Sequence, residues 1–391
     1  MRIALMTPGF SADETDWCIP ALLNLVRELA RGHDVHVFAL RYPHSAGTYT
    51  VHGATVHALG GAEVDGLGRV PLLMRALVMV VKEGRWGHFD VVHGLWADEP
   101  GFLAVMTGRL LRVPVVVSLL GGELEYMPAL RYGHQLSHAA RWLIAVALHR
   151  ADRVTVGSSY LYHRALTRLP TKRLIQIPLG VDISHFHPGP VHHLVMQEGK
   201  PRLLHVASLV PVKDQTTLLR AFAGVVRYFS GAHLHIIGTG PLRYELEVLA
   251  SSLDIVEHLT FHEGVSHDRL PDYYRSADLF VLSSQYESQG MVVLEAAACG
   301  LPTVSTAVGV VPDLGAAART VPVGDEEALT KVLLNLLTHP AARDEMASKG
   351  LALVRERFAL TYTVRMLEGL YDELATSGRA RHALFKPNST S

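Results

Sequence analysis

The segment E-S-Q-G-M-V-V-L-E, residues 287–295, runs directly into A-A-A-C-G-L-P, residues 296–302. The pattern predicts a short helix over 291–298, with Ser288 as its N-cap and Gly300 as its stop. A glycine turn stands before the helix, and a glutamate lies on each side of that turn. The segment therefore joins two carboxylates to a loop that ends in a helix N-terminus.

Strand patterns at 278–283 and 302–306 flank this segment. A strand, a glycine-containing loop and a helix N-terminus together present free backbone N–H groups and the positive end of a helix dipole, which suits a diphosphate. Glu295 would then accept hydrogen bonds from two ribose hydroxyls, and Glu287 would face the group on the distal phosphate. This arrangement indicates a nucleotide sugar. The alternative is that Glu295 is a buried helix glutamate satisfied by nearby backbone and Glu287 a solvated loop residue.

The segment resembles the retaining glycosyltransferases of family GT4, which have the GT-B fold and carry Glu-x7-Glu followed by Glu-Ala-x-Ala-x-Gly-x-Pro. Both carboxylates match, and so do five small residues: Gly290, Ala296, Ala298, Gly300 and Pro302. The resemblance extends over about residues 1–375, strongly over 200–310 and loosely before 170. It implies two doubly wound Rossmann-like domains that face a central cleft, with a C-terminal helix crossing back to the first domain.

The composition is that of a globular chain. Its 391 residues suffice for two domains, with 49% hydrophobic and 19% charged residues. The net charge of -1 argues against a nucleic-acid partner. Cys18 and Cys299 are too few for a disulfide framework, and the start M-R-I-A-L-M-T-P-G reads as a strand and a turn rather than a signal peptide. We therefore expect a cytoplasmic protein.

Two apolar stretches, 70–81 and 142–148, are too short or too charged to span a bilayer. Arginine and histidine residues flank the second stretch, as in an interfacial helix that faces anionic lipid. A buried helix with snorkelling ends explains the same residues. Peripheral contact with the inner face of a membrane is thus one of two interpretations.

Strand patterns alternate with longer helical patterns from the first residue onward, which indicates stacked βαβ units and an α/β fold. In the first half, strands are expected at 2–7, 34–40, 91–94, 114–119, 153–157 and 174–177. In the second half, they are expected at 202–207, 233–237, 259–262, 279–282 and 303–305. Ligands of such sheets gather at the carboxyl ends of the strands.

These patterns and the resemblance set the expected domain boundaries. An N-terminal acceptor-binding domain covers 1–183, and a linker rich in His, Pro and Gly covers 184–198. A nucleotide-sugar-binding domain covers 199–356. An amphipathic crossover helix follows over 357–376, and a flexible tail over 377–391.

Lys213 follows the strand at 202–207 and stands where the family has a lysine that contacts phosphate. Its ammonium would neutralise the departing diphosphate. The family's glycine and arginine in this element are Ala207 and Ser208 here, which removes one bidentate phosphate contact. In the alternative reading Lys213 is a solvated lysine and the nearby glycines only permit turns. The resemblance implies further donor contacts from Ser208, Gly238, Gly240, Val265, Gly290, Met291 and Val292.

The resemblance is looser in the first domain. Gly9 stands alone where the family commonly has a Gly-Gly pair, so Gly9 and nearby amides would meet a phosphate. Leu120 replaces a family histidine that contacts the donor sugar, and a leucine cannot donate a hydrogen bond to a hydroxyl. Gly121, Gly122 and Glu123 follow, and we expect them to bind acceptor or sugar hydroxyls.

His93 matches a histidine that the family often carries at the end of an earlier strand. We expect it to line the site and take part in catalysis, with Asp98 and Glu99 as weaker candidates. A structural histidine is the alternative, since the chain has 23 histidines.

The predicted reaction is transfer of a sugar from a nucleotide-diphosphate sugar to a hydroxyl acceptor with retention, in which the acceptor attacks the anomeric carbon on the face that the diphosphate leaves. Glu287, Lys213 and His93 are the catalytic candidates. No cofactor or metal is expected, because no metal-ligand spacing is present. The base, sugar, acceptor and oligomeric state are not set by the sequence.

Two other classes of enzyme fit the sequence less well, and a binding protein stays open. A glycoside hydrolase would also use two glutamates, but a helix-borne glutamate beside a phosphate-type loop suits ribose better. A nicotinamide-dependent dehydrogenase would need G-x-G-x-x-G after the first strand, where P-G-F-S-A-D stands. A catalytically impaired nucleotide-sugar-binding subunit stays open, because Leu120 and Ser208 depart from the family pattern.

Overall fold

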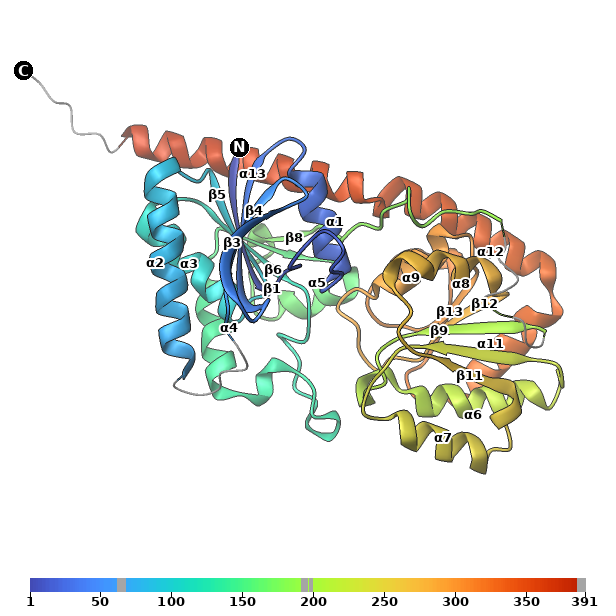
Figure 1. Ribbon diagram of the computed structural model, residues 1–391. Helices are drawn as coiled ribbons and strands as arrows, with labels where there is room; N and C mark the ends of the chain where they lie inside the picture. Colours follow the sequence, from blue (N-terminus) through green and yellow to red (C-terminus); the bar gives the residue numbers. More distant parts are fainter. Residues whose placement is uncertain (62–67, 191–195, 197–199, 385–391) are drawn as a thin grey trace, which may run out of the picture. The chain divides into compact units, whose positions relative to one another are not determined.

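The computed structural model describes residues 1–61, 68–190, 196 and 200–384 (Figure 1). The chain forms two compact units. Unit 1 comprises Met1–Gly157, Tyr162–Pro178 and Leu360–Ser391, and unit 2 comprises Ser158–Leu161 and Leu179–Ala359. Among the described helices, none has the length and apolar character that a bilayer crossing requires.

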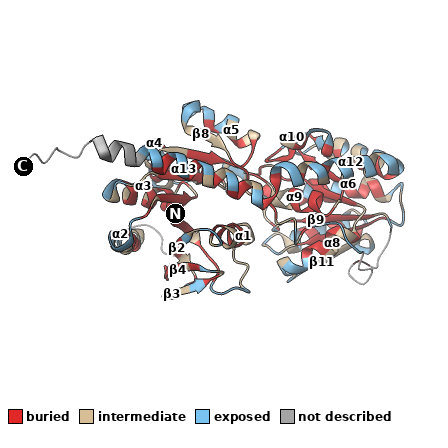
Figure 2. Cartoon of the chain, turned by 90° about the horizontal axis from the view of Figure 1, so that it is seen from above, coloured by how far each residue is buried: buried red, intermediate tan, exposed pale blue. Residues whose placement is uncertain are grey.

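Unit 1 is built on an eight-stranded sheet with the order β3-β4-β2-β1-β5-β6-β7-β8. Its strands are β1 (Arg2–Gly9), β2 (Asp34–Tyr42), β3 (Ala46–Val51), β4 (Ala54–Leu59), β5 (Val91–Leu95), β6 (Val115–Leu119), β7 (Arg153–Val156) and β8 (Leu174–Gln176). All neighbours pair in parallel except β3 and β4, which are antiparallel. The central strands are almost wholly buried and read as continuous Val/Ile/Leu runs, as a sheet covered on both faces requires (Figure 2). The hairpin of β3 and β4 was not predicted.

Helices cover both faces of this sheet: α2 and α3 lie on one side, and α1 and α13 on the other (Figure 1). The helices of unit 1 are α1 (Pro20–Leu29), α2 (Arg69–Gly87), α3 (Glu99–Leu111), α4 (His138–Arg150) and α13 (Leu360–Leu384), with short turns η2 (Pro128–Leu130), η3 (His134–Leu136) and η4 (Thr171–Arg173). Helix α5 (Ser159–Leu166) begins in unit 2 and continues in unit 1.

Helix α13 belongs to unit 1, as the expected return of the C-terminal helix requires. Its Tyr371 hydroxyl lies 2.6 Å from Nδ1 of His93, and its Thr363 donates to the carbonyl of Pro178 at 2.8 Å. The helix starts at Leu360 and runs to Leu384, so the part of the expected flexible tail over 377–384 is helical. The expectations for 191–195 and 197–198 of the linker and for 385–391 of the tail lie outside the described residues.

Unit 2 has a six-stranded, fully parallel sheet with the order β11-β10-β9-β12-β13-β14. Its strands are β9 (Arg202–Val206), β10 (His233–Ile237), β11 (Leu259–His262), β12 (Leu279–Leu282), β13 (Thr303–Thr306) and β14 (Arg319–Val321), the last of which was not predicted. Its helices are α6 (Gln215–Val226), α7 (Arg243–Ser252), α8 (Leu270–Ser276), α9 (Met291–Ala298), α10 (Val311–Leu314), α11 (Glu326–Thr338) and α12 (Pro340–Leu353). Its short turns are η5 (Pro211–Lys213), η6 (Val256–His258), η7 (His267–Arg269), η8 (Gly315–Ala317) and the π-helical η9 (Val354–Phe358).

Two hydrophobic cores hold this second sheet. Helices α6, α7 and α11 pack on one face, and α8, α9 and α10 pack on the other. The strand order reverses direction between β9 and β12, because β9 pairs with β10 on one side and with β12 on the other. The loops that follow β9 and β12 lie side by side and lead to helices on opposite faces of the sheet. Such a topological switch point is the place where open α/β sheets bind ligands.

Candidate functional site

An ion pair joins the two loops that meet at the switch point of unit 2. Lys213, at the end of the loop after β9, places its Nζ 2.5 Å from Oε1 of Glu287, in the loop after β12. The hydroxyl of Ser284 donates to the same oxygen at 2.7 Å. Glu287 is buried, and the Lys213 side chain is partly buried. Two residues predicted from separate motifs are thus brought into direct contact.

A neutral histidine, His205 in β9, lies near this pair. Burial lowers the pKa of His205 to about 4, and its Nδ1 donates to the carbonyl of Val281 at 2.9 Å. Gln215, at the start of α6, lies 3.4 Å from the other ring nitrogen and donates to the Ser208 carbonyl at 3.0 Å. The positive charge at this place is therefore that of Lys213 rather than of a protonated histidine. Ser208 was predicted to bind the donor. In the structure its backbone carbonyl accepts the hydrogen bond from Gln215, which holds the loop after β9.

The second glutamate of the motif lies inside α9 and is buried. Oε2 of Glu295 accepts a 2.9 Å hydrogen bond from the hydroxyl of Tyr274 on α8. Its Oε1 lies 3.8 Å from Nε2 of His267, whose ring stacks on that of His185. Burial raises the pKa of Tyr274 well above its ordinary value, so the phenol keeps its proton and remains a donor. Tyr274 could not be recognised from the sequence, because a tyrosine in a helix is usually a packing residue.

The helix N-terminus differs in one detail from the prediction. The N-cap of α9 is Gly290, with a φ of +85°, and not Ser288. The left-handed backbone at Gly290 suits glycine. Met291 and Val292 form the first turn, where backbone N–H groups have no partner within the helix. The loop is fixed by Gln289, whose side-chain amide makes hydrogen bonds with both the N–H and the carbonyl of Leu179.

The glycine pair after β10 has a packing reason. A Cβ on Gly238 would lie 2.0 Å from the carbonyl oxygen of Ala207, and one on Gly240 would lie 2.4 Å from that of Leu209. Close approach of the loops after β9 and β10 therefore requires glycine at both positions. Val265, predicted to face the nucleobase, follows Gly264 and packs against the core beside α9.

Glu123 in unit 1 holds a loop rather than offering an open carboxylate. Its side chain is fully buried and accepts hydrogen bonds from the N–H groups of Leu120 at 3.0 Å, Gly121 at 2.7 Å and Ala97 at 3.4 Å. The expectation that Glu123 binds hydroxyls is thus not supported by its surroundings, because its oxygens are turned onto the backbone. Gly122 packs against the Tyr132 ring.

His93 also lies inside the core rather than on an open surface. It is 1% exposed, its Nδ1 lies 2.6 Å from the Tyr371 hydroxyl, and its Nε2 lies 2.7 Å from Oγ of Ser118. Burial lowers the pKa of His93 to about 3. Both ring nitrogens are thus bonded inside the core, where His93 joins α13 to the sheet, and these surroundings do not favour the predicted role in catalysis. Glu99 is likewise buried and paired with Arg41.

Gly9 ends β1 at the switch point of unit 1, where β1 lies between β2 and β5. A Cβ on Gly9 would lie 3.0 Å from that of Tyr42. Gly9, the last residue of β1, and Gly121, just after β6, thus both lie at the carboxyl edge of this sheet.

Within the described residues, one group has the donor atoms for a metal: His36, His57 and Glu83. Arg2 donates to Nε2 of His36 at 2.9 and 3.2 Å, and the other ring nitrogen of His36 lies 3.0 Å from Nε2 of His57. A guanidinium against the same histidine repels a cation. The group is better described as a hydrogen-bonded chain from Arg2 into the sheet.

Comparisons with known proteins fit this geometry. Residues 193–352 match the family described as Glycosyl transferases group 1, and residues 21–185 match Glycosyltransferase Family 4. The two sheet-based units have the GT-B fold, and the two family matches give the class, which is the glycosyltransferases. The chain belongs to the family 4 glycosyltransferases.

Two curated relatives illustrate the range of the family. A GDP-mannose-dependent alpha-(1-6)-phosphatidylinositol monomannoside mannosyltransferase of Mycolicibacterium smegmatis is 31% identical over 56% of this chain and 63% of its own length. A D-inositol 3-phosphate glycosyltransferase of Rhodococcus erythropolis is 27% identical over 88% of this chain and 84% of its own length. The chain thus spans less than two thirds of the length of the first of these relatives.

Two solved structures share the fold. Sucrose-phosphate synthase from Thermosynechococcus elongatus aligns with a TM-score of 0.78 at 20% identity, over 96% of this chain and 99% of the other. HepE of Anabaena, in complex with UDP, aligns with a TM-score of 0.75 at 16% identity, over 96% and 100%.

Proposed function

We propose that the protein is a retaining glycosyltransferase that moves a sugar from a nucleotide-diphosphate sugar to a hydroxyl acceptor. The observation that carries the proposal is the contact between Lys213 and Glu287 across the switch point of unit 2, directly before the N-terminus of α9. A cation, a helix N-terminus and two glutamates on adjoining elements match the parts of a sugar nucleotide: diphosphate, ribose and sugar.

In this proposal the diphosphate lies against Lys213 and the amides of Gly290, Met291 and Val292. Glu295 accepts hydrogen bonds from the ribose hydroxyls through Oε1, since Tyr274 occupies Oε2. Glu287 contacts the transferred sugar. The pair of Lys213 and Glu287 in the free protein keeps each charge compensated until the ligand arrives.

The reaction would proceed by attack of the acceptor hydroxyl on the anomeric carbon as its bond to the diphosphate breaks. The hydroxyl attacks on the face that the diphosphate leaves, so the anomeric configuration is retained without a protein nucleophile, and the departing diphosphate takes the acceptor's proton. Lys213 and the amides of α9 stabilise the charge on the leaving group, and catalysis is mainly electrostatic and positional. The proposal includes no metal and no cofactor. Unit 1 would bind the acceptor, and the backbone of the loop after β6 that Glu123 holds would be among its contacts.

The test is a panel of UDP-, GDP- and ADP-sugars, read out by thermal shift and by release of the nucleoside diphosphate. We expect a shift and slow release with one donor, and loss of both in Glu295→Ala but not in Glu345→Ala, which removes an exposed glutamate. A shift without release, with acceptors supplied, would instead indicate a binding subunit, which the leucine at 120 favours. No response to any donor would refute the proposal.

We further propose that α2 contacts the surface of an anionic membrane. Four large apolar side chains are exposed on this helix: Val70, Met74, Val78 and Trp86, with exposed fractions of 56%, 56%, 63% and 84%. They are four or eight residues apart, which places them along one side of the helix. Exposed Arg75, Lys82 and Arg85 lie on the same helix. An exposed apolar stripe beside basic side chains suits the interface of anionic lipid. In α4, by contrast, Leu143, Ile144, Ala147 and Leu148 are buried, and Trp142 is the one large apolar side chain of 142–148 that is exposed.

Sedimentation with phosphatidylglycerol vesicles tests this contact. Met74→Glu with Val78→Glu should abolish co-sedimentation, because two carboxylates would enter the interface. Val248→Glu, at a valine on α7 that is 51% exposed, is the matched control and should leave it unchanged. Equal sedimentation of all three proteins would refute the proposal.

A further inference from the structure

Unit 1 contains a hollow of about 750 Å³ at the amino edge of its sheet, where α3 and α4 end and β6 begins. This edge is opposite the carboxyl edge that carries Gly9 and Gly121, so the hollow is separate from the candidate site. Its volume is within the range of about 300–1,000 Å³ that small-molecule sites occupy. Its apolar lining comes from Val105, Met106, Val113, Pro114, Val146 and Leu374.

Three arginines line the hollow together with one aspartate: Arg109, Arg112, Arg150 and Asp152. The aspartate is already engaged, because its Oδ2 accepts from the N–H of Val115 at 2.9 Å. Arg109 and Arg150 are exposed, and neither forms an ion pair within the part of the chain that the structure describes. The charged side chains of the hollow thus carry a net positive charge, and guanidinium forks suit phosphate oxygens.

Helix capping does not account for these arginines. Cations at the carboxyl ends of helices stabilise the dipole, and Arg109 and Arg150 lie in the last turns of α3 and α4. The last carbonyls of α4, however, already accept hydrogen bonds from Arg173, which donates to the oxygens of Leu148 and Ala151 at 2.5 Å each. Nor does capping require an apolar hollow between the two helix ends.

We propose that this hollow binds a phosphate amphiphile: a phosphate held by Arg109 and Arg150, with a hydrocarbon group on the apolar lining. Inorganic phosphate would leave the apolar lining uncovered, and a neutral amphiphile would leave the guanidinium groups unpaired. The ligand is either a monomer in solution or a headgroup within a bilayer, since both present the same chemistry. The site is independent of the proposed transferase reaction.

The experiment is titration calorimetry of the full chain with dihexanoyl phosphatidate, which is monomeric at the concentrations used. We expect saturable binding that weakens about tenfold or more in Arg109→Gln with Arg150→Gln, as the loss of two charge-assisted contacts implies. Val146→Trp, which fills the hollow and leaves the arginines in place, should weaken it similarly. Arg355→Gln with Arg357→Gln, a matched pair of exposed arginines in unit 2, should bind like wild type.

Further titrations distinguish a soluble ligand from a bilayer headgroup and test the two parts of the amphiphile separately. Dihexanoyl phosphatidylcholine tests the need for net anionic charge, inorganic phosphate tests the need for the hydrocarbon, and phosphatidate vesicles test the bilayer source. Binding of the monomer supports a soluble ligand, and binding of both the monomer and the vesicles, lost together in the arginine variant, supports a headgroup. Equal affinity for the choline lipid, unchanged affinity in the arginine or Val146 variants, or binding of vesicles alone that the arginine variant retains would overturn the proposal.

Discussion

The hydroxyl of Tyr274 donates a 2.9 Å hydrogen bond to Oε2 of Glu295, and both side chains are buried. The two residues lie on neighbouring helices, α8 and α9, so the bond fixes the carboxylate relative to the helix N-terminus. Because burial raises the pKa of Tyr274 well above its ordinary value, the donor persists throughout the neutral range. One oxygen of Glu295 is therefore held by the protein, and the other is left to meet a ligand.

The first prediction is that Tyr274→Phe weakens binding of the preferred nucleoside diphosphate. The change removes the hydroxyl and keeps the ring, so the carboxylate gains rotational freedom without a cavity. Loss of one such hydrogen bond corresponds to roughly fivefold in affinity. Calorimetry with the nucleoside diphosphate and with its 2′-deoxy analogue should show that the ribose hydroxyl contributes less in the variant than in wild type.

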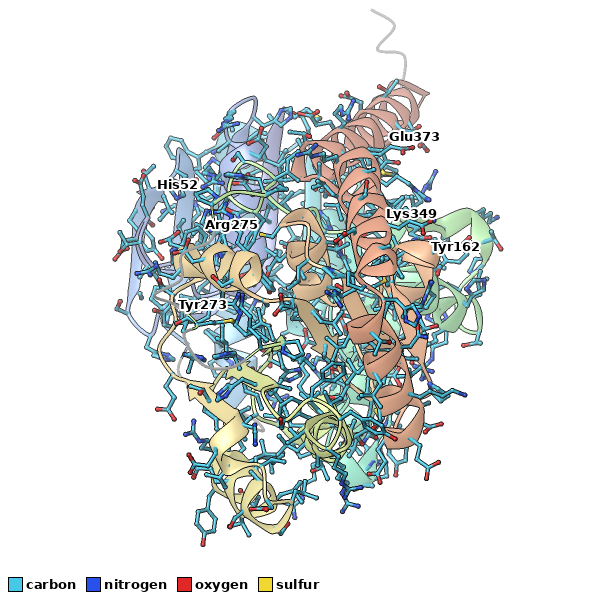
Figure 3. All side chains as sticks on the ribbon, turned by 90° about the vertical axis from the view of Figure 1, so that its right-hand side faces the viewer. His52, Tyr162, Tyr273, Arg275, Lys349 and Glu373 are labelled. Carbon is cyan, nitrogen blue, oxygen red and sulfur yellow. The ribbon has the colours of Figure 1, made fainter. Side chains whose placement is uncertain are left out.

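Tyr273→Phe is the matched control for this experiment. Tyr273, labelled in Figure 3, is only partly buried. It precedes Tyr274 on α8, and its ring packs edge-on against that of His262. It should bind like wild type. Equal affinity of Tyr274→Phe and wild type would show that Glu295 is positioned without Tyr274, whereas no binding by wild type would refute the proposed function itself.

A second prediction concerns Lys213→Gln, which should lower turnover by about 10²–10³-fold, because charge on the leaving group loses its cation. The measurement is release of nucleoside diphosphate under saturating donor. The control is Lys349→Gln: Lys349, labelled in Figure 3, lies 2.5 Å from Glu345 in an exposed pair of the same length. Turnover unchanged in Lys213→Gln would remove Lys213 from the mechanism.

Two glycine substitutions should shift stability in opposite directions. Gly238→Ala places a Cβ 2.0 Å from the Ala207 carbonyl, at a φ of +147°, and should destabilise the fold by about 1–3 kcal/mol or more. Gly369→Ala, on α13 with nothing within 4 Å, should stabilise it by about 0.5–1 kcal/mol. Urea unfolding measures both, and a neutral Gly238→Ala would show that the two loops can separate without cost.

The stability should also fall as the pH drops below 6.5. Burial lowers the pKa of His93 and of His235 to about 3 and that of His205 to about 4. In the unfolded chain these rings take up protons below about pH 6.5, while the folded chain keeps them neutral. Proton uptake therefore stabilises the unfolded state relative to the folded state. Each ring should lower the free energy of unfolding by about 1 kcal/mol when the pH falls from 7.5 to 5.5.

Urea titrations at the two pH values measure this loss. Other groups titrate as well, so the comparison with His93→Gln isolates one ring: the variant should lose about 1 kcal/mol less than wild type over the same interval. An identical pH dependence in both proteins would mean that His93 is protonated in the fold.

Much of the fold could be read from local patterns. The strands at 233–237 and 279–282 were predicted with the bounds that the structure has, because parallel strands buried on both faces are short apolar runs between turns, and the half-buried edge strand at 259–262 was predicted with equal accuracy. The hairpin of β3 and β4 was missed. Its outer strand, β3, is largely exposed and polar, so it lacks an apolar run, and only pairing with β4 makes it a strand.

The candidate residues divide in the same way. Local patterns were enough to predict the two-sheet α/β architecture, the motif of Glu287 and Glu295 and the lysine at 213, because spacing along one element fixes which residues follow a strand or share a helix. The tertiary structure alone decided that Lys213 contacts Glu287, that Tyr274 holds Glu295, and that His93 and Glu123 are buried in hydrogen bonds. Those contacts join elements far apart in the chain, and whether a polar side chain meets a ligand or its own backbone depends on packing that no local pattern records.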